Sequence, residues 1–392
     1  MSKKSPQLRF EGFTDDWEER KLSSGLREYT DRVIVEDDKE YYQISVRNNF
    51  GGITLRGSKM GNKIGRKRQA KINLTKYPQT LIFTRQTVEQ GGIGWVDKYC
   101  DGAIVTENMP TISLDTSVFS KYFLTNLFQT RIFYKNAILD NIEGGSAQIA
   151  IHESKFLSST LLFPNLDEQE KIGQFFKQLD DTIDLHQRKL DLLKEQKKGY
   201  LQKMFPKNGA KVPELRFAGF ADDWELRKSK ELCTISTGKG NTQDKVDDGA
   251  YPFYVRSATI EKSDEYLYDQ EAVLTVGDGV GTGKVYHYVN GKYNLHQRVY
   301  RMYDFKDVSA KYFYYYFSNN FYKRVMSMTA KTSVDSVRME MIADMNIVFP
   351  SVKEQENIVE LFSNLDNTIA LHQRKLDLLK EQKKGFLQKM FV

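Results

Sequence analysis

Apolar residues recur at alternating steps of four and three residues along two long stretches of this chain. The first stretch runs from Ile172 to Met204 and the second from Ile358 to Met390. A pattern sustained over nearly five heptads predicts two long helices that pair along apolar seams as a coiled coil. The predicted seam residues are Ile172, Phe176, Leu179, Ile183, His186, Leu190 and Leu193, then Ile358, Phe362, Leu365, Ile369, His372, Leu376 and Leu379.

Proline and charge predict where each helix begins. Pro164 and Pro350 lie just upstream of the seams, where a helix cannot yet have begun. The carboxylates of Glu168 and Glu354 suit a first turn, and lysines suit the last turn, because of the helix dipole. A helix of about 37 residues would be roughly 55 Å long.

The two predicted helices are almost the same sequence. HQRKLDLLKEQKKGYLQKMF begins at His186 and HQRKLDLLKEQKKGFLQKMF at His372, with nineteen of twenty positions identical. A second repeat, PQLRFEGFTDDWEERK from Pro6 and PELRFAGFADDWELRK from Pro213, precedes each half. The chain is therefore a duplicated frame around two unlike inserts, residues 22–162 and 229–348.

The chain path predicts how the helices pair. The first helix ends where the second insert begins, and the second helix begins where that insert ends. An antiparallel pair needs no stretched segment, whereas a parallel pair would make the second insert bridge the whole helix length. We therefore expect an antiparallel pair with a pseudo-twofold axis near His186 and His372. The alternative is two amphipathic helices that each pack only on their own domain.

Both inserts combine short apolar runs, such as residues 80–84 and 272–276, with glycine-rich turns and an aromatic run at residues 312–317. This mixture predicts an α+β fold with two mixed α/β domains. The two glycine-rich turns, at residues 91–96 and 277–284, favour a shared domain architecture. The predicted domains are residues 1–163, helix 164–206, residues 207–349 and helix 350–392.

The net charge of +6, from 58 basic and 52 acidic residues, raises the case for nucleic acid only slightly. The location of the basic residues is more informative. One cluster of Lys and Arg in the first insert lies among glycines, which let the protein backbone approach a ligand closely. The cluster comprises Lys59, Lys63, Arg66, Lys67, Arg68 and Lys71. Such a cluster suits phosphate contact along a duplex, although a solvated surface would look the same.

No catalytic or cofactor motif accompanies this pattern. The stretch from Gly277 to Lys284 fails as a P-loop, because three residues separate Gly279 from Gly283 and Val285 follows the lysine. The five histidines and two cysteines show no metal-binding spacing. We also expect a cytoplasmic protein, because the start lacks a signal sequence, no apolar run could span a membrane and the cysteines suggest a reducing compartment.

The pattern as a whole resembles the specificity subunits of type I restriction-modification enzymes. The resemblance rests on the entrances at Phe163–Gln169 and Phe349–Gln355, on the LDxTIxL segments, and on the repeated RKLDLLKEQKKG stretches from Arg188 and Arg374. It covers essentially the whole chain.

The resemblance implies a non-catalytic subunit with two target recognition domains, each reading one half of an asymmetric DNA site. The helices would fix the spacer and dock two modification subunits, with restriction subunits completing the complex. S-adenosylmethionine, ATP and Mg would belong to those partners. Base contacts are expected from long polar side chains on insert loops. The candidates are Arg85, Gln86, Asn241, Gln243, Asn294, Gln297 and Arg298, and Lys284 is a further candidate for DNA contact.

Two other readings remain open at this point. A self-contained restriction–methylation enzyme is disfavoured by the missing motifs and the short chain. A coiled-coil scaffold that reads no DNA would be satisfied by the duplicated helices alone. Inserting residues between Met204 and Pro213 is expected to change the spacer if the helices act as a ruler.

Overall fold

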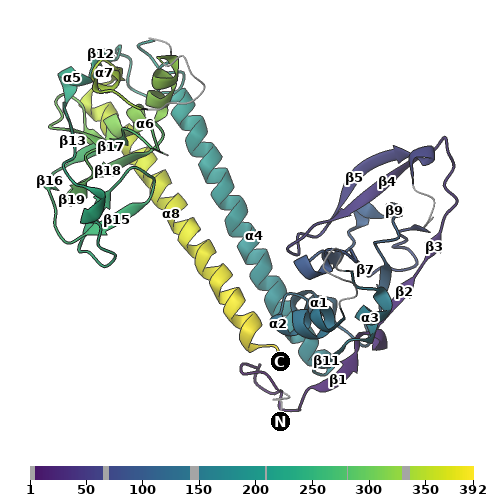
Figure 1. The fold of residues 1–392 in the computed structure, drawn as a ribbon. Helices are drawn as coiled ribbons and strands as arrows, with labels where there is room; N and C mark the ends of the chain where they lie inside the picture. Colours follow the sequence, from purple (N-terminus) through teal and green to yellow (C-terminus); the bar gives the residue numbers. More distant parts are fainter. Residues whose placement is uncertain (1–4, 65–69, 142–149, 208–209, 280, 329–335) are drawn as a thin grey trace. The chain divides into compact units, whose positions relative to one another are not determined.

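The computed structural model describes residues 5–64, 70–141, 150–207, 210–279, 281–328 and 336–392. The chain forms two compact units (Figure 1). Unit 1 comprises residues 1–187 and 374–392, and unit 2 comprises residues 188–373. Each unit therefore combines one insert with parts of both long helices.

Unit 1 is built on three sheets. The frame contributes the antiparallel pair β1 (Glu18–Lys21) and β11 (Thr160–Phe163). The second sheet has the order β2 (Leu26–Tyr29), β10 (Thr111–Leu114), β7 (Thr80–Phe83) and β8 (Ile93–Trp95). The third has the order β3 (Asp31–Arg32), β6 (Ala70–Lys71), β9 (Ile104–Val105), β4 (Glu40–Val46) and β5 (Ile53–Met60). Its short helices are α1 (Lys121–Leu127), α2 (Arg131–Phe133) and α3 (Glu153–Ser158).

Unit 2 repeats this plan. The frame pair is β12 (Glu225–Lys228) with β21 (Asn346–Phe349). The next sheet has the order β13 (Thr234–Thr237), β20 (Val299–Tyr303), β17 (Ala272–Val276) and β18 (Tyr286–Val289). The last has the order β15 (Ile260–Ser263), β14 (Tyr251–Tyr254), β19 (Lys292–Leu295) and β16 (Tyr268–Asp269). Its helices are α5 (Ser229–Leu232), α6 (Ala310–Ser327) and α7 (Met339–Ala343).

The two unlike inserts therefore share the order of one four-stranded sheet and of three strands of the next, where β16 in unit 2 stands in place of β3 and β6 in unit 1. In both units the parallel contact, β4 with β9 or β14 with β19, joins the same two strands of the plan. The apolar runs at residues 80–84 and 272–276 become the equivalent buried strands β7 and β17. This agreement confirms the predicted α+β fold and the shared domain architecture.

The two predicted long helices are present as α4 (Leu166–Lys203) and α8 (Val352–Lys389), each of 38 residues. In unit 1 the start of α4 lies against the end of α8, since Lys383 Nζ is 2.7 Å from Asp180 Oδ1. In unit 2 the end of α4 lies against the start of α8 through Lys197 and Asp366. The helices are thus antiparallel within each unit, and neither helix packs only on its own domain.

The predicted seam positions are buried or half-buried along both helices. Leucines at other positions of the same helices, such as Leu185 and Leu371, are exposed. Burial therefore follows the heptad pattern and not hydrophobicity alone. The division between the units falls after Gln187 and Gln373, beside the two seam histidines.

The end of each long helix completes the core of the other insert's unit. In unit 1 the Phe391 ring lies 5.2 Å from Phe123 and 6.3 Å from Trp17. In unit 2 the equivalent Phe205 ring lies 5.7 Å from Tyr312 and stacks 5.8 Å from Phe362. Aromatic packing of this kind fixes each helix end against the frame.

Candidate nucleic-acid interface

A buried ion pair fastens each long helix to the frame segment ahead of its insert. Arg9 donates from Nε and Nη2 to the Glu168 carboxylate at 2.6 and 2.7 Å. Arg216 donates to Glu354 in the same way at 2.7 and 2.8 Å. Both carboxylates are almost fully buried, and the hydrogen bonds raise the pKa of both arginines. Two parallel bonds fix direction as well as distance, so each frame segment is held in one orientation on its helix.

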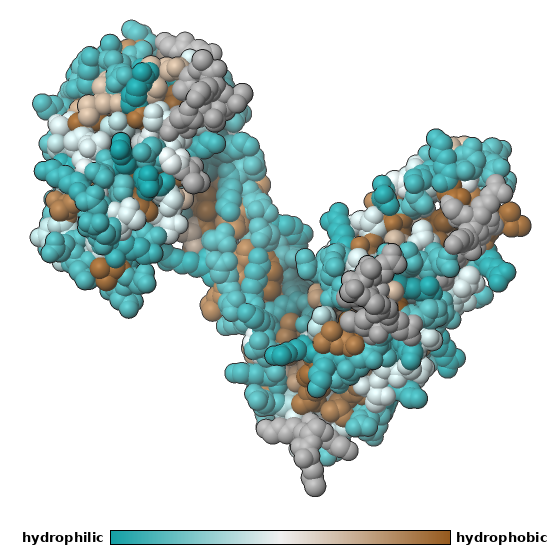
Figure 2. Space-filling view, viewed as in Figure 1, coloured by the Kyte–Doolittle hydropathy of each residue, from teal (hydrophilic) through white to brown (hydrophobic). Residues whose placement is uncertain are grey.

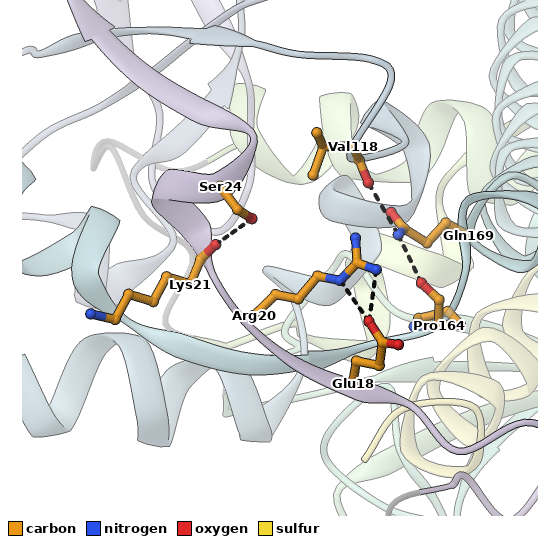
Figure 3. A network of polar contacts seen from close by, with 7 residues as sticks. All are labelled: Glu18, Arg20, Lys21, Ser24, Val118, Pro164 and Gln169. Carbon is orange, nitrogen blue, oxygen red and sulfur yellow. Dashed lines mark hydrogen bonds and ion pairs between the residues drawn. The ribbon is translucent and has the colours of Figure 1, made fainter.

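The glutamine that follows each buried glutamate closes the entrance to the helix. Gln169 donates to the carbonyl oxygens of Pro164 and Val118, at 3.0 and 3.4 Å (Figure 3). Its Oε1 accepts the backbone N–H of Ser120 at 3.1 Å. Gln355 makes the equivalent contacts in unit 2. The repeated Glu–Gln pair therefore joins the helix start to the insert.

Several loops of unit 2 meet at one end of its two larger sheets. Gln297 N–H donates to the Gly240 carbonyl at 2.8 Å, and Gly277 N–H donates to the Arg298 carbonyl at 2.8 Å. A Cβ at Gly277 would lie 2.7 Å from that carbonyl oxygen, so this approach requires glycine. The loops line an open pocket of about 330 Å³. Its lining includes Thr242, Lys245, Arg256, Glu261, Gly279 and His296.

His296 organises the floor of this loop cluster. Its Nδ1 accepts the backbone N–H of Arg298 at 3.1 Å, and its Nε2 lies 3.3 Å from Thr242 Oγ1. Burial, with the nearby charge of Arg256, lowers the pKa of His296. The ring is therefore neutral at pH 7, with its proton on Nε2 and directed at Thr242.

Two arginines on the rim share one aspartate. Arg256 Nη1 lies 3.6 Å from Asp278 Oδ1, and Arg298 Nε lies 3.7 Å from Asp278 Oδ2. The arginine side chains are 51% and 64% exposed, and that of Asp278 is 29% exposed. These distances exceed those of hydrogen bonds, and such exposed pairs add at most about 1 kcal/mol to stability.

The structure brings most of the unit 2 candidates together. Asn241, Gln243, Gln297 and Arg298 are exposed on the meeting loops. Asn294 is the exception, because it is only 3% exposed and its Oδ1 accepts the backbone N–H of Leu295. A buried strand residue of this kind cannot present an amide to DNA.

Lys284 is exposed on the β17–β18 turn, where its Nζ lies 5.0 Å from the centre of the Tyr322 ring on α6. This turn leads from strand to strand, as the failed P-loop pattern predicts. Arg256 and Asp278 were missed by sequence reasoning, since no local pattern links two residues on different strand ends.

Unit 1 places other residues at the equivalent strand ends. Arg85 N–H donates to the Asn108 carbonyl at 3.0 Å and Arg85 O accepts from Ile151, as Gly277 does with Arg298 and Val337 in unit 2. The exposed side chains there are Arg47, Gln86 and Asn108.

The other unit 1 candidates have different surroundings. The Arg85 side chain is half-buried and donates to Glu153 at 2.8 Å, so its guanidinium is partly used within the unit. Lys59 and Lys63 are exposed on β5 and just after it. Arg66, Lys67 and Arg68 lie outside the described residues.

Among the described residues, no group of three or more histidine, cysteine or acidic side chains could hold a metal ion. No described helix is long and apolar enough to cross a membrane. On the face drawn in Figure 2 the surface of each unit is mostly hydrophilic, with apolar residues in small separate groups. The exposed candidates on the unit 2 loops, Asn241, Gln243, Gln297 and Arg298, are all polar, which suits a polar ligand.

Comparison with known proteins agrees with the duplicated plan. The chain is 26% identical over 166 residues to the specificity subunit of the type I restriction enzyme EcoDI of Escherichia coli, covering 42% of this chain and 36% of the relative. It is 21% identical over 280 residues to the MjaVIII specificity subunit of Methanocaldococcus jannaschii, covering 64% of this chain and 66% of the relative. The matches thus span about one third to two thirds of these relatives.

Solved structures show the same fold at low sequence identity. The S subunit of a type I restriction-modification system from M. genitalium has a TM-score of 0.68 and 12% identity, with 99% of both chains covered. A chain from a structure of the type I R-M system has a TM-score of 0.52 and 15% identity, with 96% of this chain and 97% of that chain covered.

The type I restriction modification DNA specificity domain matches this chain twice, at residues 15–195 and 221–381. These two regions contain both inserts and most of both long helices. The chain therefore belongs to the type I restriction-modification DNA specificity family, with one domain of that family in each half of its duplicated sequence.

Proposed function

We propose that this chain is the DNA sequence-specificity subunit of a type I restriction-modification complex. Each unit reads one half of a bipartite, asymmetric site, and the long helices set the spacer between the halves. The observation that carries the proposal is the pair of topologically equivalent units with unlike side chains on the same strand ends. Equivalent scaffolds suit a duplex with its own twofold symmetry, and unlike side chains suit two different half-sites.

Replacing residues 22–162 with the first insert of another family member tests this division of labour. The complex assembled with its modification subunits is expected to methylate a site in which only one half has changed. Sequencing the methylated positions in genomic DNA gives the result directly. A change in both halves would contradict the two-reader proposal.

The scaffold alternative is tested by salt. A complex that contacts phosphates releases counterions, so the logarithm of its affinity falls linearly with the logarithm of salt concentration. We expect this slope for the assembled complex on duplex DNA. A flat response would favour a scaffold that does not touch DNA.

In this proposal the chain itself performs no catalysis. S-adenosylmethionine belongs to the two modification subunits, and ATP and Mg belong to restriction subunits in the full complex. Support comes from the two matches to a DNA specificity domain and from a sequence without methyltransferase or nucleotide-binding motifs.

Four exposed leucines are our candidates for docking the modification subunits. Leu185 and Leu371 are equivalent positions and are 62% and 66% exposed. Leu192 and Leu378, also equivalent, are 62% and 51% exposed. Each unit holds one leucine of each kind, which suits two copies of one partner. In each helix the two leucines lie seven residues apart, two turns along one face, and apolar residues along the helices are visible in Figure 2.

The duplication supplies a matched control for this docking proposal. Leu185→Glu with Leu378→Glu alters unit 1, and Leu371→Glu with Leu192→Glu alters unit 2 equally. Each double variant is expected to lose one modification subunit, and the quadruple variant both, as measured by mass photometry of the co-expressed complex. Full occupancy of the quadruple variant would show that the partners dock elsewhere.

A further inference from the structure

The shared aspartate of unit 2 leaves its two arginines with free donors. The carboxylate of Asp278 faces one edge of each guanidinium, Nη1 of Arg256 and Nε of Arg298. No hydrogen bond from either guanidinium is present among the described residues, and both side chains are at least half exposed. A guanidinium has five donors in a fixed plane, so most of them remain available to a ligand.

The backbone that carries Arg298 and Asp278 is fixed by its hydrogen-bond partners. Arg298 follows His296, whose neutral ring accepts the Arg298 N–H, and the Arg298 carbonyl accepts from Gly277. Asp278 follows Gly277 directly and forms a β-bridge with Ser336. Arg298 and Asp278 therefore extend from a rigid base, and Arg256 lines the adjacent pocket of about 330 Å³.

The charge arrangement favours a base edge over a phosphate. Asp278 lies within 4 Å of both arginines, so its negative charge offsets one of their two positive charges and repels an approaching phosphate. The surrounding exposed side chains, Asn241 and Gln297, are amides that suit base edges as well. An arginine presented in this way matches the two acceptors of guanine, O6 and N7, in the major groove.

We infer that Arg256 and Arg298 read guanines in the half-site of unit 2, and that Asp278 is the residue that positions both. The inference rests on the proposed function and adds the bases that one unit prefers. Unit 1 has Arg47, Gln86 and Asn108 at its equivalent loops, so we expect its half-site to contain different bases.

The test uses the assembled complex and a pool of duplex DNA with randomised positions. The wild-type complex is expected to select a bipartite sequence with guanine at two positions of one half. Arg256→Gln and Arg298→Gln are each expected to lower the guanine preference at one of these positions by about 5- to 150-fold. The other half-site stays unchanged.

Asp278→Asn retains both arginines and is expected to weaken the guanine preference at both positions together. Arg227→Gln is the matched control, because Arg227 belongs to the frame strand β12 and pairs with Glu225 and Asp307. It makes the same change of charge and should leave the selected sequence intact.

Salt dependence separates base reading from phosphate contact. If Arg256 or Arg298 contacts a phosphate, the glutamine variant weakens binding to all sequences and lowers the salt slope by about one, which would overturn the inference. A bipartite site selected equally by wild type and variants would overturn it too. A wild-type complex that selects no sequence would instead refute the proposed function itself.

Discussion

A buried glutamate at the start of each long helix forms an ion pair with an arginine of the frame segment. Glu354 is 1% exposed, and its charge is compensated by the two hydrogen bonds from Arg216. Two charged groups taken out of water give little net stability, but removing one of them leaves the other uncompensated. The main effect of the Arg216–Glu354 pair is therefore to fix the orientation of the frame segment on the helix, and its contribution to stability is small.

Arg216→Ala is expected to destabilise unit 2 by about 3–5 kcal/mol, because the Glu354 carboxylate stays buried without a partner. Urea unfolding followed by hydrogen exchange measures the loss in each unit. Lys353→Ala is the control, since its pair with Glu356 is exposed on both sides and should change stability by less than about 1 kcal/mol. Equal, small effects of the two variants would contradict this role for Arg216.

The buried thiol of Cys233 makes the free energy of unfolding depend on pH in the alkaline range. Burial raises the pKa of this thiol from 9.0 to about 12, and Ser229 opposes the change through a hydrogen bond. In the unfolded chain the thiol ionises near its ordinary value, so the unfolded state binds fewer protons between pH 9 and 12. The stabilisation is therefore complete below pH 9 and is lost as pH rises toward 12.

We expect Cys233 to resist alkylation by iodoacetamide at pH 8 in the folded protein, and the unfolding free energy to fall as pH rises above 9. Cys233→Ser should reduce the dependence of the unfolding free energy on alkaline pH. Cys100→Ser is the comparison, because Cys100 is the buried cysteine of unit 1. Rapid alkylation of folded Cys233 at pH 8 would disprove the burial effect.

At the scale of elements, each long helix is shared between two units. Phe391 at the end of α8 is buried in unit 1, and Phe205 just after α4 is its equivalent in unit 2. Phe391→Ala is expected to destabilise unit 1 by about 3–5 kcal/mol, and Phe205→Ala to do the same to unit 2. Hydrogen exchange resolved by segment distinguishes the two. Protection lost from unit 1 in Phe391→Ala and from unit 2 in Phe205→Ala, but not from the unit that holds the start of the altered helix, would confirm the exchange of helix ends.

The frame could be predicted from the sequence because its signals are local and repeated. The heptad pattern gave both helices and their seams, and Pro164 and Pro350 gave their starts within two residues. The common topology of the inserts could only be suspected from two glycine-rich turns. Equivalent strands in the two units have different side chains, since burial constrains only whether a residue is apolar.

The candidate site was partly predictable for a different reason. Residue type predicts loop positions for Asn241, Gln297 and Arg298, and these three are exposed on loops, but Asn294 is the same type of residue and is buried in the sheet. Arg256 and Asp278 come from different strand ends that only the folded sheets bring within 4 Å of each other. Pairing across strands depends on register, which the sequence alone does not specify here.

At the scale of the whole molecule, the segment that follows α4 decides whether an insertion there can change the spacer between the half-sites. Met204, Phe205 and Pro206 are buried in unit 2, and Leu215 N–H donates to the Lys203 carbonyl at 2.9 Å. The residues before and after 208–209 are therefore both held at the end of α4. Residues 208–209 themselves lie outside the described residues. Extra residues between Met204 and Pro213 would form a loop on unit 2, so we now expect such an insertion to leave the spacer unchanged.

The helices themselves pass from one unit to the other, at Gln187 in α4 and Gln373 in α8. Inserting three heptads after each of these residues preserves the seam and lengthens both helices by about 32 Å. That is close to one turn of B-DNA, so both half-sites keep the same face of the duplex. We expect methylation at a site whose spacer is about nine or ten base pairs longer, as read from sequencing of methylated DNA.

Single-heptad insertions at Gln187 and Gln373 provide the contrast. They lengthen the helices by about 10 Å, or about three base pairs, but rotate one half-site by roughly a third of a turn relative to the other. We expect this variant to methylate weakly at any spacer, because the two units then face different sides of the duplex. A three-heptad variant that keeps the original spacer would show that the helices do not measure the distance.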